Sequence, residues 1–275
     1  MGVLFNGSII GEEDAVLLVS DKAIWFDFGV YESIKVIQGK AFYADKHIAR
    51  FFRSAECIGM KMGFSQKEVL EWISMFISHE KLDNALLRLF AYGDTEKNKQ
   101  VRIYVFALGL TFYPNSFYSL GAKAITYPGE RFMPDSKSFN LLLNFLAYKK
   151  AQENEAIEAL LIDKEGFVRE GTRSNLFIIE KNIIVTPPAS QVLLGVTRDL
   201  LMQWVRKKDW IVIEEKISKV RLREAREVMI TSTSMNVMPI VMIDNQQVGD
   251  GKVGERTREL YLLFREKQRE YSKKM

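Results

Sequence analysis

Hydrophobic and polar positions in the first part of the chain follow two periods, one typical of strands and one typical of helices. Runs rich in β-branched and aromatic residues at 29–37, 85–92 and 102–108 predict strands. Apolar positions within 46–60 and 66–78 recur at helical spacing and predict two amphipathic helices. This order of elements predicts an α+β unit in which two helices cover one face of a sheet.

Turn and capping signals add detail to this unit. Asn6-Gly7 predicts a hairpin within 1–10, and a further strand is expected at 15–19. Asp45 and Ser65 each precede a helical pattern, so each is expected to cap the N-terminus of its helix.

The rest of the chain predicts a second α+β unit. Strands are expected at 122–127, 159–162, 167–168, 175–179, 183–186, 210–214, 227–230 and 240–243. Helices are expected at 141–154, 197–207, 220–225 and 255–270. The predicted organisation is a small N-terminal domain at 1–113, an interdomain linker at 114–120 and a large domain at 121–275.

Composition excludes several classes of function. The net charge of +4 is spread over 275 residues, and the basic stripe with interleaved aromatics that nucleic-acid binding requires is missing. With one cysteine and two histidines, a zinc site or a serine–histidine triad would be under-supplied. With no signal peptide and no apolar run of membrane-spanning length, we expect a soluble, cytoplasmic protein that binds no membrane.

Four features in the second half carry candidate chemistry. Lys137 lies between a predicted strand and a predicted helix, where partial desolvation would make its amine nucleophilic. Glu170 lies beside a glycine turn that enters a strand, and the hydroxyl cluster 231–234 follows a strand. Gly195 precedes a helix whose free amide groups, with the Thr197 hydroxyl, favour an anion. Alone, each has an ordinary explanation as a surface charge, a turn or a cap.

Together, an amine, a carboxylate and a phosphate-sized anion site describe what pyridoxal phosphate requires. The amine forms a Schiff base, the carboxylate keeps the pyridine nitrogen protonated, and the helix start holds the phosphate.

Six motifs occur in order along the chain. They are Phe28-Gly29-Val30-Tyr31-Glu32, His47-Ile48-Ala49-Arg50-Phe51, Lys137-Ser138, Glu170-Gly171-Thr172-Arg173-Ser174-Asn175, Gly195-Val196-Thr197-Arg198 and Thr231-Ser232-Thr233. With them the chain resembles, over nearly its whole length, the class IV (fold-type IV) pyridoxal-phosphate aminotransferases. That family includes D-amino-acid and branched-chain aminotransferases and aminodeoxychorismate lyase. The resemblance implies an α+β fold with a smaller N-terminal α/β sandwich domain and a larger C-terminal pseudo-barrel domain.

The resemblance also implies roles for individual residues. Lys137 would bind the cofactor as a Schiff base and move a proton between substrate and cofactor, and Glu170 would pair with the pyridine nitrogen. The other implied cofactor contacts are Arg50, Ser174, Asn175, Val196, Thr197, Ser232 and Thr233. The implied substrate contacts are Tyr31, Arg88 and Ser234.

The identity of the substrate stays open. Branched-chain members usually carry a tyrosine five residues after the lysine, and this chain has Leu142 there. D-amino-acid members typically bind the substrate carboxylate with an arginine and a histidine in the loop after Tyr92, and the loop 93–98 has neither. Arg88 or Arg102 is an alternative carboxylate contact.

We therefore expect an aminotransferase that moves an amino group from a D-amino acid or a branched-chain L-amino acid to a 2-oxo acid such as 2-oxoglutarate or pyruvate. The family further implies a homodimer. The alternatives are an aminodeoxychorismate lyase and a binding protein on the same scaffold without the cofactor. The intact set of Lys137, Glu170 and Arg50 argues against the binding protein.

Overall fold

The computed structural model describes residues 1–93, 100–207 and 210–273, and these form two compact units. Unit 1 comprises Met1–Thr111, Ser136–Asn140 and Gln268–Met275, and unit 2 comprises Phe112–Asp135 and Leu141–Lys267. The division into domains at 1–113 and 121–275, drawn from the sequence, stays a prediction.

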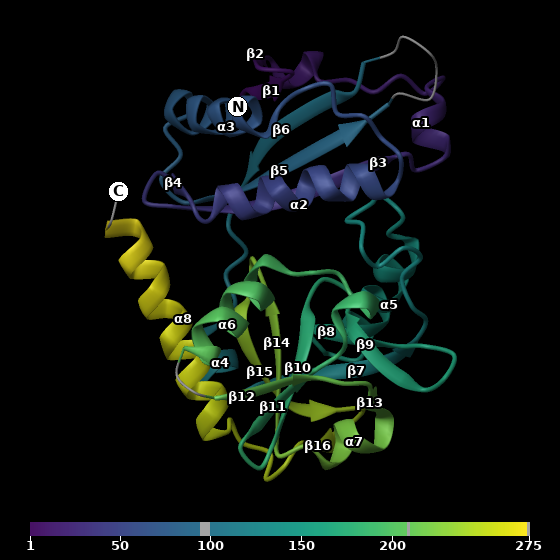
Figure 1. The fold of residues 1–275 in the computed structure, drawn as a ribbon, viewed down its shortest axis with the longest axis vertical. Coiled ribbons are helices and arrows are strands. Elements are labelled where there is room, and N and C mark those ends of the chain that lie inside the picture. The colour runs from purple at the N-terminus through teal and green to yellow at the C-terminus, as the bar shows by residue number, and fades with distance from the viewer. Residues whose placement is uncertain (94–99, 208–209, 274–275) are drawn as a thin grey trace. The chain divides into compact units, whose positions relative to one another are not determined.

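Unit 1 is built on an antiparallel sheet of six strands in the order β2-β1-β6-β5-β3-β4 (Figure 1). The strands are β1 Val3–Phe5, β2 Ser8–Ile10, β3 Gly29–Ile37, β4 Lys40–Ala41, β5 Ala85–Tyr92 and β6 Arg102–Leu108. The helical segments are the 3-10 turn Glu12–Asp14, α1 Lys22–Trp25, α2 Ala44–Cys57 and α3 Gln66–His79. The predicted hairpin, the strands 85–92 and 102–108 and the two amphipathic helices are confirmed.

Helices α2 and α3 cover one face of this sheet because their apolar positions repeat at helical spacing. Ile48, Phe51 and Ala55 of α2 and Ile73 and Phe76 of α3 are fully or almost fully buried in one core with alternate residues of β3, β5 and β6. The remaining residues of the same strands, which alternate with the buried ones, therefore point to the opposite face of the sheet.

Two local predictions for unit 1 are wrong. Residues 15–19 form no strand but follow the 3-10 turn as irregular backbone, because the apolar run Val16–Val19 is exposed and has no strand beside it among the described residues. Asp45 does not cap α2: Tyr43 occupies the N-cap in a left-handed conformation, and Asp45 lies in the first turn. The Ser65 cap of α3 is confirmed, as part of a reciprocal capping box with Glu68.

Unit 2 contains a mixed sheet of ten strands in the order β12-β11-β10-β14-β15-β7-β8-β9-β13, with β16 paired to β15. The strands are β7 Ala122–Pro128, β8 Glu158–Ile162, β9 Phe167–Gly171, β10 Asn175–Glu180, β11 Ile183–Thr186, β12 Ile211–Glu214, β13 Ile217–Ser218, β14 Glu227–Ser232, β15 Asn236–Ile243 and β16 Gln246–Gln247. The helical segments are α4 Asn115–Ser119, α5 Leu142–Glu153, the 3-10 turn Ala189–Gln191, α6 Val196–Arg206, α7 Lys219–Glu224 and α8 Glu255–Lys273. Pairs β7–β8, β7–β15 and β11–β12 are parallel.

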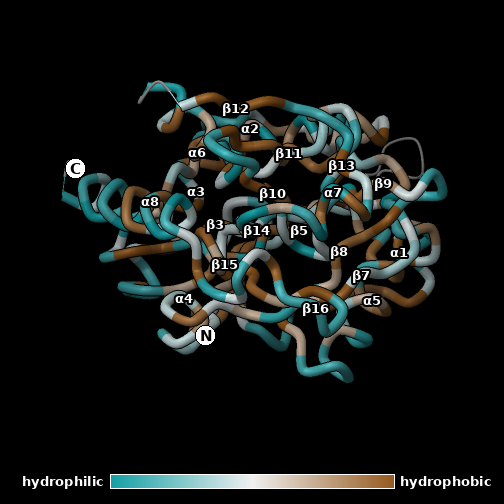
Figure 2. Tube along the Cα trace, turned by 90° about the horizontal axis from the view of Figure 1, so that it is seen from below, coloured by the Kyte–Doolittle hydropathy of each residue, from teal (hydrophilic) through white to brown (hydrophobic). Residues whose placement is uncertain are grey.

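The central strands of unit 2 are buried on both faces. In β8 every residue is buried, with Leu160 in one apolar core and Ala159 and Leu161 in another beneath α5. Such strands read as continuous apolar runs rather than alternating ones. Figure 2 shows the contrast with α8, which is mainly hydrophilic with hydrophobic stretches. Within the described ranges, no helix is both long enough and apolar enough to cross a membrane.

The capping box of α3 gives a stability prediction. Ser65→Ala removes the hydroxyl that accepts the Glu68 N–H, at 3.2 Å, so the free energy of unfolding should fall by about 1 kcal/mol. Ser78→Ala is the matched control, because its hydroxyl donates to the Ser74 carbonyl of the same helix and does not cap the helix N-terminus. Thermal melts of both variants check the difference, and an equal effect of the two changes would contradict the capping role.

Candidate active site

Lys137 is held against the sheet of unit 1 by backbone hydrogen bonds. The segment Ser136–Asn140 pairs with β3: the Tyr31 N–H donates to the Lys137 carbonyl at 2.9 Å, and the Phe139 N–H donates to the Gly29 carbonyl at 3.0 Å. The Lys137 N–H in turn donates to Ser54 Oγ of α2 at 3.0 Å. Both partners of the segment are regular elements of unit 1, so they fix the position of the lysine backbone.

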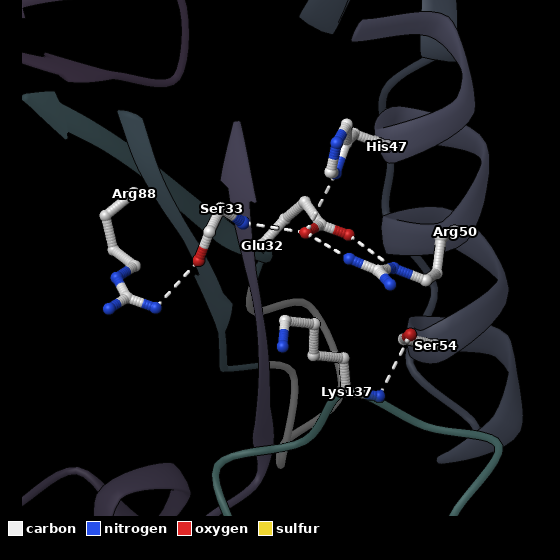
Figure 3. A network of polar contacts seen from close by, with 7 residues as sticks. All are labelled: Glu32, Ser33, His47, Arg50, Ser54, Arg88 and Lys137. Carbon is white, nitrogen blue, oxygen red and sulfur yellow. Dashed lines mark hydrogen bonds and ion pairs between the residues drawn. The ribbon is translucent and has the colours of Figure 1, made fainter. Parts of the chain in front are cut away.

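The side chain of Lys137 lies on the sheet face opposite α2 and α3, beside two other predicted site residues. Its amine is 4.1 Å from the centroid of the Tyr31 ring, and the Arg88 guanidinium is 5.5 Å from the same centroid. Arg88 Nη1 donates to Ser33 Oγ at 2.8 Å, which directs the guanidinium toward β3 (Figure 3). One aromatic ring therefore has an amine and a guanidinium around it.

Arg50, on α2, is buried in an ion pair with Glu32 of β3 (Figure 3). Arg50 Nε donates to Glu32 Oε2 at 2.8 Å, and Nη2 donates to Oε1 at 2.6 Å, in a bidentate arrangement. His47, one turn earlier on α2, places Nδ1 3.2 Å from Glu32 Oε1. The carboxylate is fully buried, so its charge depends on these partners.

The pKa values of this cluster shift for identifiable reasons. Burial alone would raise the pKa of Glu32, but Arg50 and His47 together hold it well below its usual range. Burial lowers the pKa of His47 below 6.5, which outweighs the opposite effect of Glu32, and the charges of Arg50 and Lys137 lower it further. Glu32 is therefore ionised and His47 neutral near pH 7.

In unit 2, Glu170 is buried near the end of β9 rather than in the turn. Its Oε2 accepts the Leu193 N–H at 3.1 Å, and Arg131 Nε lies 3.8 Å from its Oε1. One oxygen of the buried carboxylate thus faces a guanidinium and the other a backbone amide donor.

The N-terminus of α6 is built as a close backbone approach. Gly195 is the N-cap, and a Cβ there would overlap Asn175 Oδ1, so the glycine lets the Asn175 side chain lie against the backbone. Asn175 Nδ2 donates to the Leu193 carbonyl at 2.7 Å, which fixes the loop that leads into the helix. Val196 and Thr197 follow in the first turn, both buried, at the positive end of the helix dipole.

The hydroxyl cluster lies where β14 turns into β15. Thr231 pairs in the sheet with Asn175, so this end of β14 is adjacent to the start of β10. Ser232 Oγ accepts the Met235 N–H at 3.1 Å and lies 3.3 Å from Ser234 Oγ. The buried Thr231 Oγ1 has no hydrogen-bond partner among the parts of the chain described here.

The predicted site residues thus fall into two groups, one in each unit. Unit 1 brings together Tyr31, Arg50, Arg88 and Lys137, and unit 2 holds Glu170, Ser174, Asn175, Val196, Thr197, Ser232, Thr233 and Ser234. Ser174 Oγ donates to the buried carboxylate of Glu158 at 2.8 Å. The loop after Tyr92, where D-amino-acid members carry an arginine and a histidine, lies mostly in 94–99, outside the described residues.

Three charged residues of these groups were missed by sequence reasoning. Glu32 pairs with Arg50, Arg131 approaches Glu170, and Glu158 accepts both the N–H and the hydroxyl of Thr172. Glu32 carried a usable signal, because a carboxylate within the strand pattern 29–37 is buried only when it is paired. Arg131 and Glu158 gave no comparable local signal.

Comparison with known proteins shows which family the chain is similar to. The family model described as Amino-transferase class IV matches residues 29–243. The chain is 34% identical over 271 residues to a D-alanine aminotransferase of Bacillus licheniformis, covering 94% of each chain. It is 30% identical over 277 residues to a putative branched-chain-amino-acid aminotransferase of Methanocaldococcus jannaschii, covering 97% of this chain and 96% of that one.

Solved structures of aminotransferases are also similar to this chain in fold. A branched-chain amino acid aminotransferase of T.th., solved with pyridoxamine 5′-phosphate, has a TM-score of 0.87 and 28% identity, over 95% of this chain and 92% of that chain. The branched-chain aminotransferase of Escherichia coli has a TM-score of 0.88 and 24% identity, over 96% and 94%. The predicted α+β fold of type IV is confirmed by this likeness.

The lowered pKa of His47 gives a pH prediction. As the pH falls below 6.5, the unfolded chain binds a proton at His47 before the folded chain does, so the free energy of unfolding falls, by up to about 1.4 kcal/mol per pH unit. Glu32 contributes little until the pH approaches 4.5, because above that value its carboxylate is largely ionised in both the folded and the unfolded chain.

Thermal melts test this prediction. They should cover pH 5.5 to 7.5, a range of about two units around the ordinary pKa of histidine. His47→Asn keeps a donor toward Glu32 but does not titrate, so its melting temperature should decline less at low pH. His79→Asn, an exposed change on α3, should keep the slope of the unaltered protein. The same slope in all three proteins would rule out burial of a neutral His47.

Proposed function

We propose that this chain, which belongs to the class IV aminotransferase family of pyridoxal-phosphate-dependent transaminases, transfers an amino group from an amino acid to a 2-oxo acid through Lys137. The observation that carries the proposal is the arrangement on β3. The Lys137 amine and the Arg88 guanidinium lie around the Tyr31 ring, 4.1 Å and 5.5 Å from its centroid. An amine and a guanidinium around one ring suit a cofactor aldehyde and a substrate carboxylate.

The residues present fit the cofactor. Gly195 makes room for the Asn175 side chain beside the start of α6, and the first turn supplies amide donors and the Thr197 hydroxyl. The orphaned Thr231 hydroxyl lies at the same end of the sheet, beside Ser232 and Thr233. Arg50 adds a fixed cation and Glu170 a buried carboxylate. As the family resemblance implies, we propose Arg50 of unit 1 and Val196, Thr197 and Thr233 of unit 2 as phosphate contacts, and Ser174, Asn175 and Ser232 as further cofactor contacts.

When bound, the cofactor supplies an electron-withdrawing ring that stabilises negative charge at the substrate Cα. Glu170, whose carboxylate faces Arg131 and the Leu193 N–H, would pair with the ring nitrogen and keep it protonated. Lys137 would hold the cofactor in the resting enzyme and, once released, carry a proton to and from the substrate Cα. The backbone hydrogen bonds of Lys137 to β3 and to Ser54 fix the point from which its side chain would reach the cofactor and the substrate.

Arg88 is our candidate for the substrate carboxylate. Its guanidinium is directed by Ser33 across the face that also carries Lys137, and Tyr31 separates the two cations. A guanidinium binds a carboxylate through two parallel hydrogen bonds, which would orient the substrate Cα relative to the amine. Ser234 is assigned to the substrate as well.

The relatives support the substrate class. Several are D-alanine aminotransferases, and others are branched-chain enzymes. The branched-chain enzyme of T.th. was solved in complex with N-(5′-phosphopyridoxyl)-L-glutamate. We propose a D-amino acid or a branched-chain L-amino acid as donor, and 2-oxoglutarate or pyruvate as acceptor.

We also propose a homodimer. Each unit exposes large apolar side chains: Val19, Trp25 and Phe26 in unit 1 are 86%, 66% and 72% exposed. In unit 2, Phe132 and Leu142 are 74% and 68% exposed. Large apolar side chains left exposed are candidates for an association surface, and a second copy of the chain is the partner that the family implies.

Borohydride reduction tests the role of Lys137. Reduction of the protein loaded with pyridoxal phosphate should add the mass of one cofactor, and peptide mapping should place it on Lys137. Lys137→Ala should show no such addition and should lose transamination. Lys35→Ala, at a buried lysine on the same strand as Tyr31, is the control for labelling elsewhere. A cofactor found on another lysine would contradict the assignment.

Arg88→Met tests the carboxylate contact. Losing a charge-assisted pair should raise KM for both donor and acceptor about 10- to 100-fold, with cofactor affinity unchanged. Arg53→Met, an exposed arginine on α2, serves as the matched control and should leave KM as it is. Unchanged KM in Arg88→Met would move the carboxylate site elsewhere.

A further inference from the structure

We propose that Glu32 is the positioning residue that orients Arg50 for the cofactor phosphate, so that a buried negative charge strengthens the binding of an anion. The inference rests on the proposed function, because it takes Arg50 as a phosphate contact. Glu32 itself would not touch the phosphate; it would act through the guanidinium.

Both carboxylate oxygens of Glu32 have polar partners within the protein. Oε2 accepts Arg50 Nε–H at 2.8 Å, and Oε1 accepts Arg50 Nη2–H at 2.6 Å and the Ser33 N–H at 2.7 Å. His47 Nδ1 is 3.2 Å from Oε1. The residue has no exposed surface, so these partners replace water completely.

This arrangement decides which edge of the guanidinium is presented to a ligand. Of the five N–H donors of an arginine, the bidentate pair occupies one on Nε and one on Nη2. The Nη1 edge therefore faces away from Glu32, as Figure 3 shows for the Arg50 side chain. An arginine held in this way loses less conformational freedom when it binds a second anion.

Charge alone predicts the opposite effect. Glu32 is ionised and cancels the charge of Arg50, so a purely electrostatic account has Glu32 weakening the attraction for phosphate. The remaining charged or titratable groups near the pair are His47, which burial keeps neutral, and Lys137. Since the two accounts differ in sign, one measurement separates them.

Positioning should be the stronger effect because Arg50 is buried. Its side chain is only 6% exposed, so without Glu32 the guanidinium has neither water nor a carboxylate on its Nε side. It would then turn toward other acceptors and lose the orientation toward the ligand. His47 Nδ1 also approaches Glu32 Oε1, the oxygen that accepts Arg50 Nη2–H.

The test compares the affinities of the apo-protein for pyridoxal 5′-phosphate and for pyridoxal, which lacks the phosphate. Damage to the fold weakens both ligands alike, whereas loss of the phosphate contact lowers only their affinity ratio. In Glu32→Gln and in Glu32→Asp we expect this ratio to fall about tenfold or more, with pyridoxal affinity nearly unchanged. Glu32→Gln removes the charge and Glu32→Asp keeps it but withdraws the carboxylate, so a fall in both points to position.

Two further variants make the result specific. Asp163→Asn breaks another ion pair of a buried carboxylate, with the partly buried Arg169 in unit 2, and should leave the ratio unchanged. Arg50→Ala should lower the ratio at least as far as Glu32→Gln, and the double variant should add little to it.

Several results would overturn the inference. A ratio that is unchanged or raised in Glu32→Gln, while Arg50→Ala lowers it, rejects positioning and leaves the proposed function intact. Equal losses for both ligands in the Glu32 variants, or a fall in Asp163→Asn, would reduce Glu32 to a general structural role. An unchanged ratio in Arg50→Ala would reject the inference together with the phosphate assignment on which the proposed function depends.

Discussion

The backbone pairing between Ser136–Asn140 and β3 is the constraint on which the candidate chemistry of unit 1 depends. It takes a segment that lies far along the chain from β3 and fixes it to the same sheet, through the Tyr31 N–H and the Gly29 carbonyl. Gly29 is required there, because a Cβ would overlap the Phe139 ring. The pairing places Lys137 over Tyr31 on one face of β3, while Glu32, the next residue, faces Arg50 on the other. A single strand thus serves both the amine and the arginine.

Unit 2 uses the same principle of close backbone approach at a different place. Asn175 begins β10, pairs with Thr231 of β14 and bonds to the loop before α6, so a strand end, a hydroxyl turn and a helix start are fixed to one another. Buried polar groups of this kind are costly unless they are fully paired. The buried carboxylate of Glu158 is paired in this way, because it accepts hydrogen bonds from the Thr172 and Ser174 hydroxyls in the turn after Glu170.

Local periodicity predicted most elements because strand and helix repeats depend on near neighbours. The strands at 85–92, 102–108 and 183–186 and the capped helix α3 were predicted at or near their observed bounds. The strand expected at 15–19 failed because an apolar run is not sufficient without a partner strand. Lys137 and Glu170 were selected from the sequence as polar residues beside turns, but their contacts were not predicted. The pairing of 136–140 with β3 and of Glu32 with Arg50 joins residues far apart in sequence, which periodicity does not report.

The central claim is that Lys137 carries a cofactor that accepts and returns an amino group, and an absorption spectrum tests it most directly. The protein loaded with pyridoxal phosphate should show a visible band from the Lys137-linked cofactor. That band should disappear when either D-alanine or a branched-chain L-amino acid is added, and it should return with 2-oxoglutarate or pyruvate. The enantiomer that removes it identifies the donor. A band that no amino acid removes, or no band at all after loading, would contradict the account.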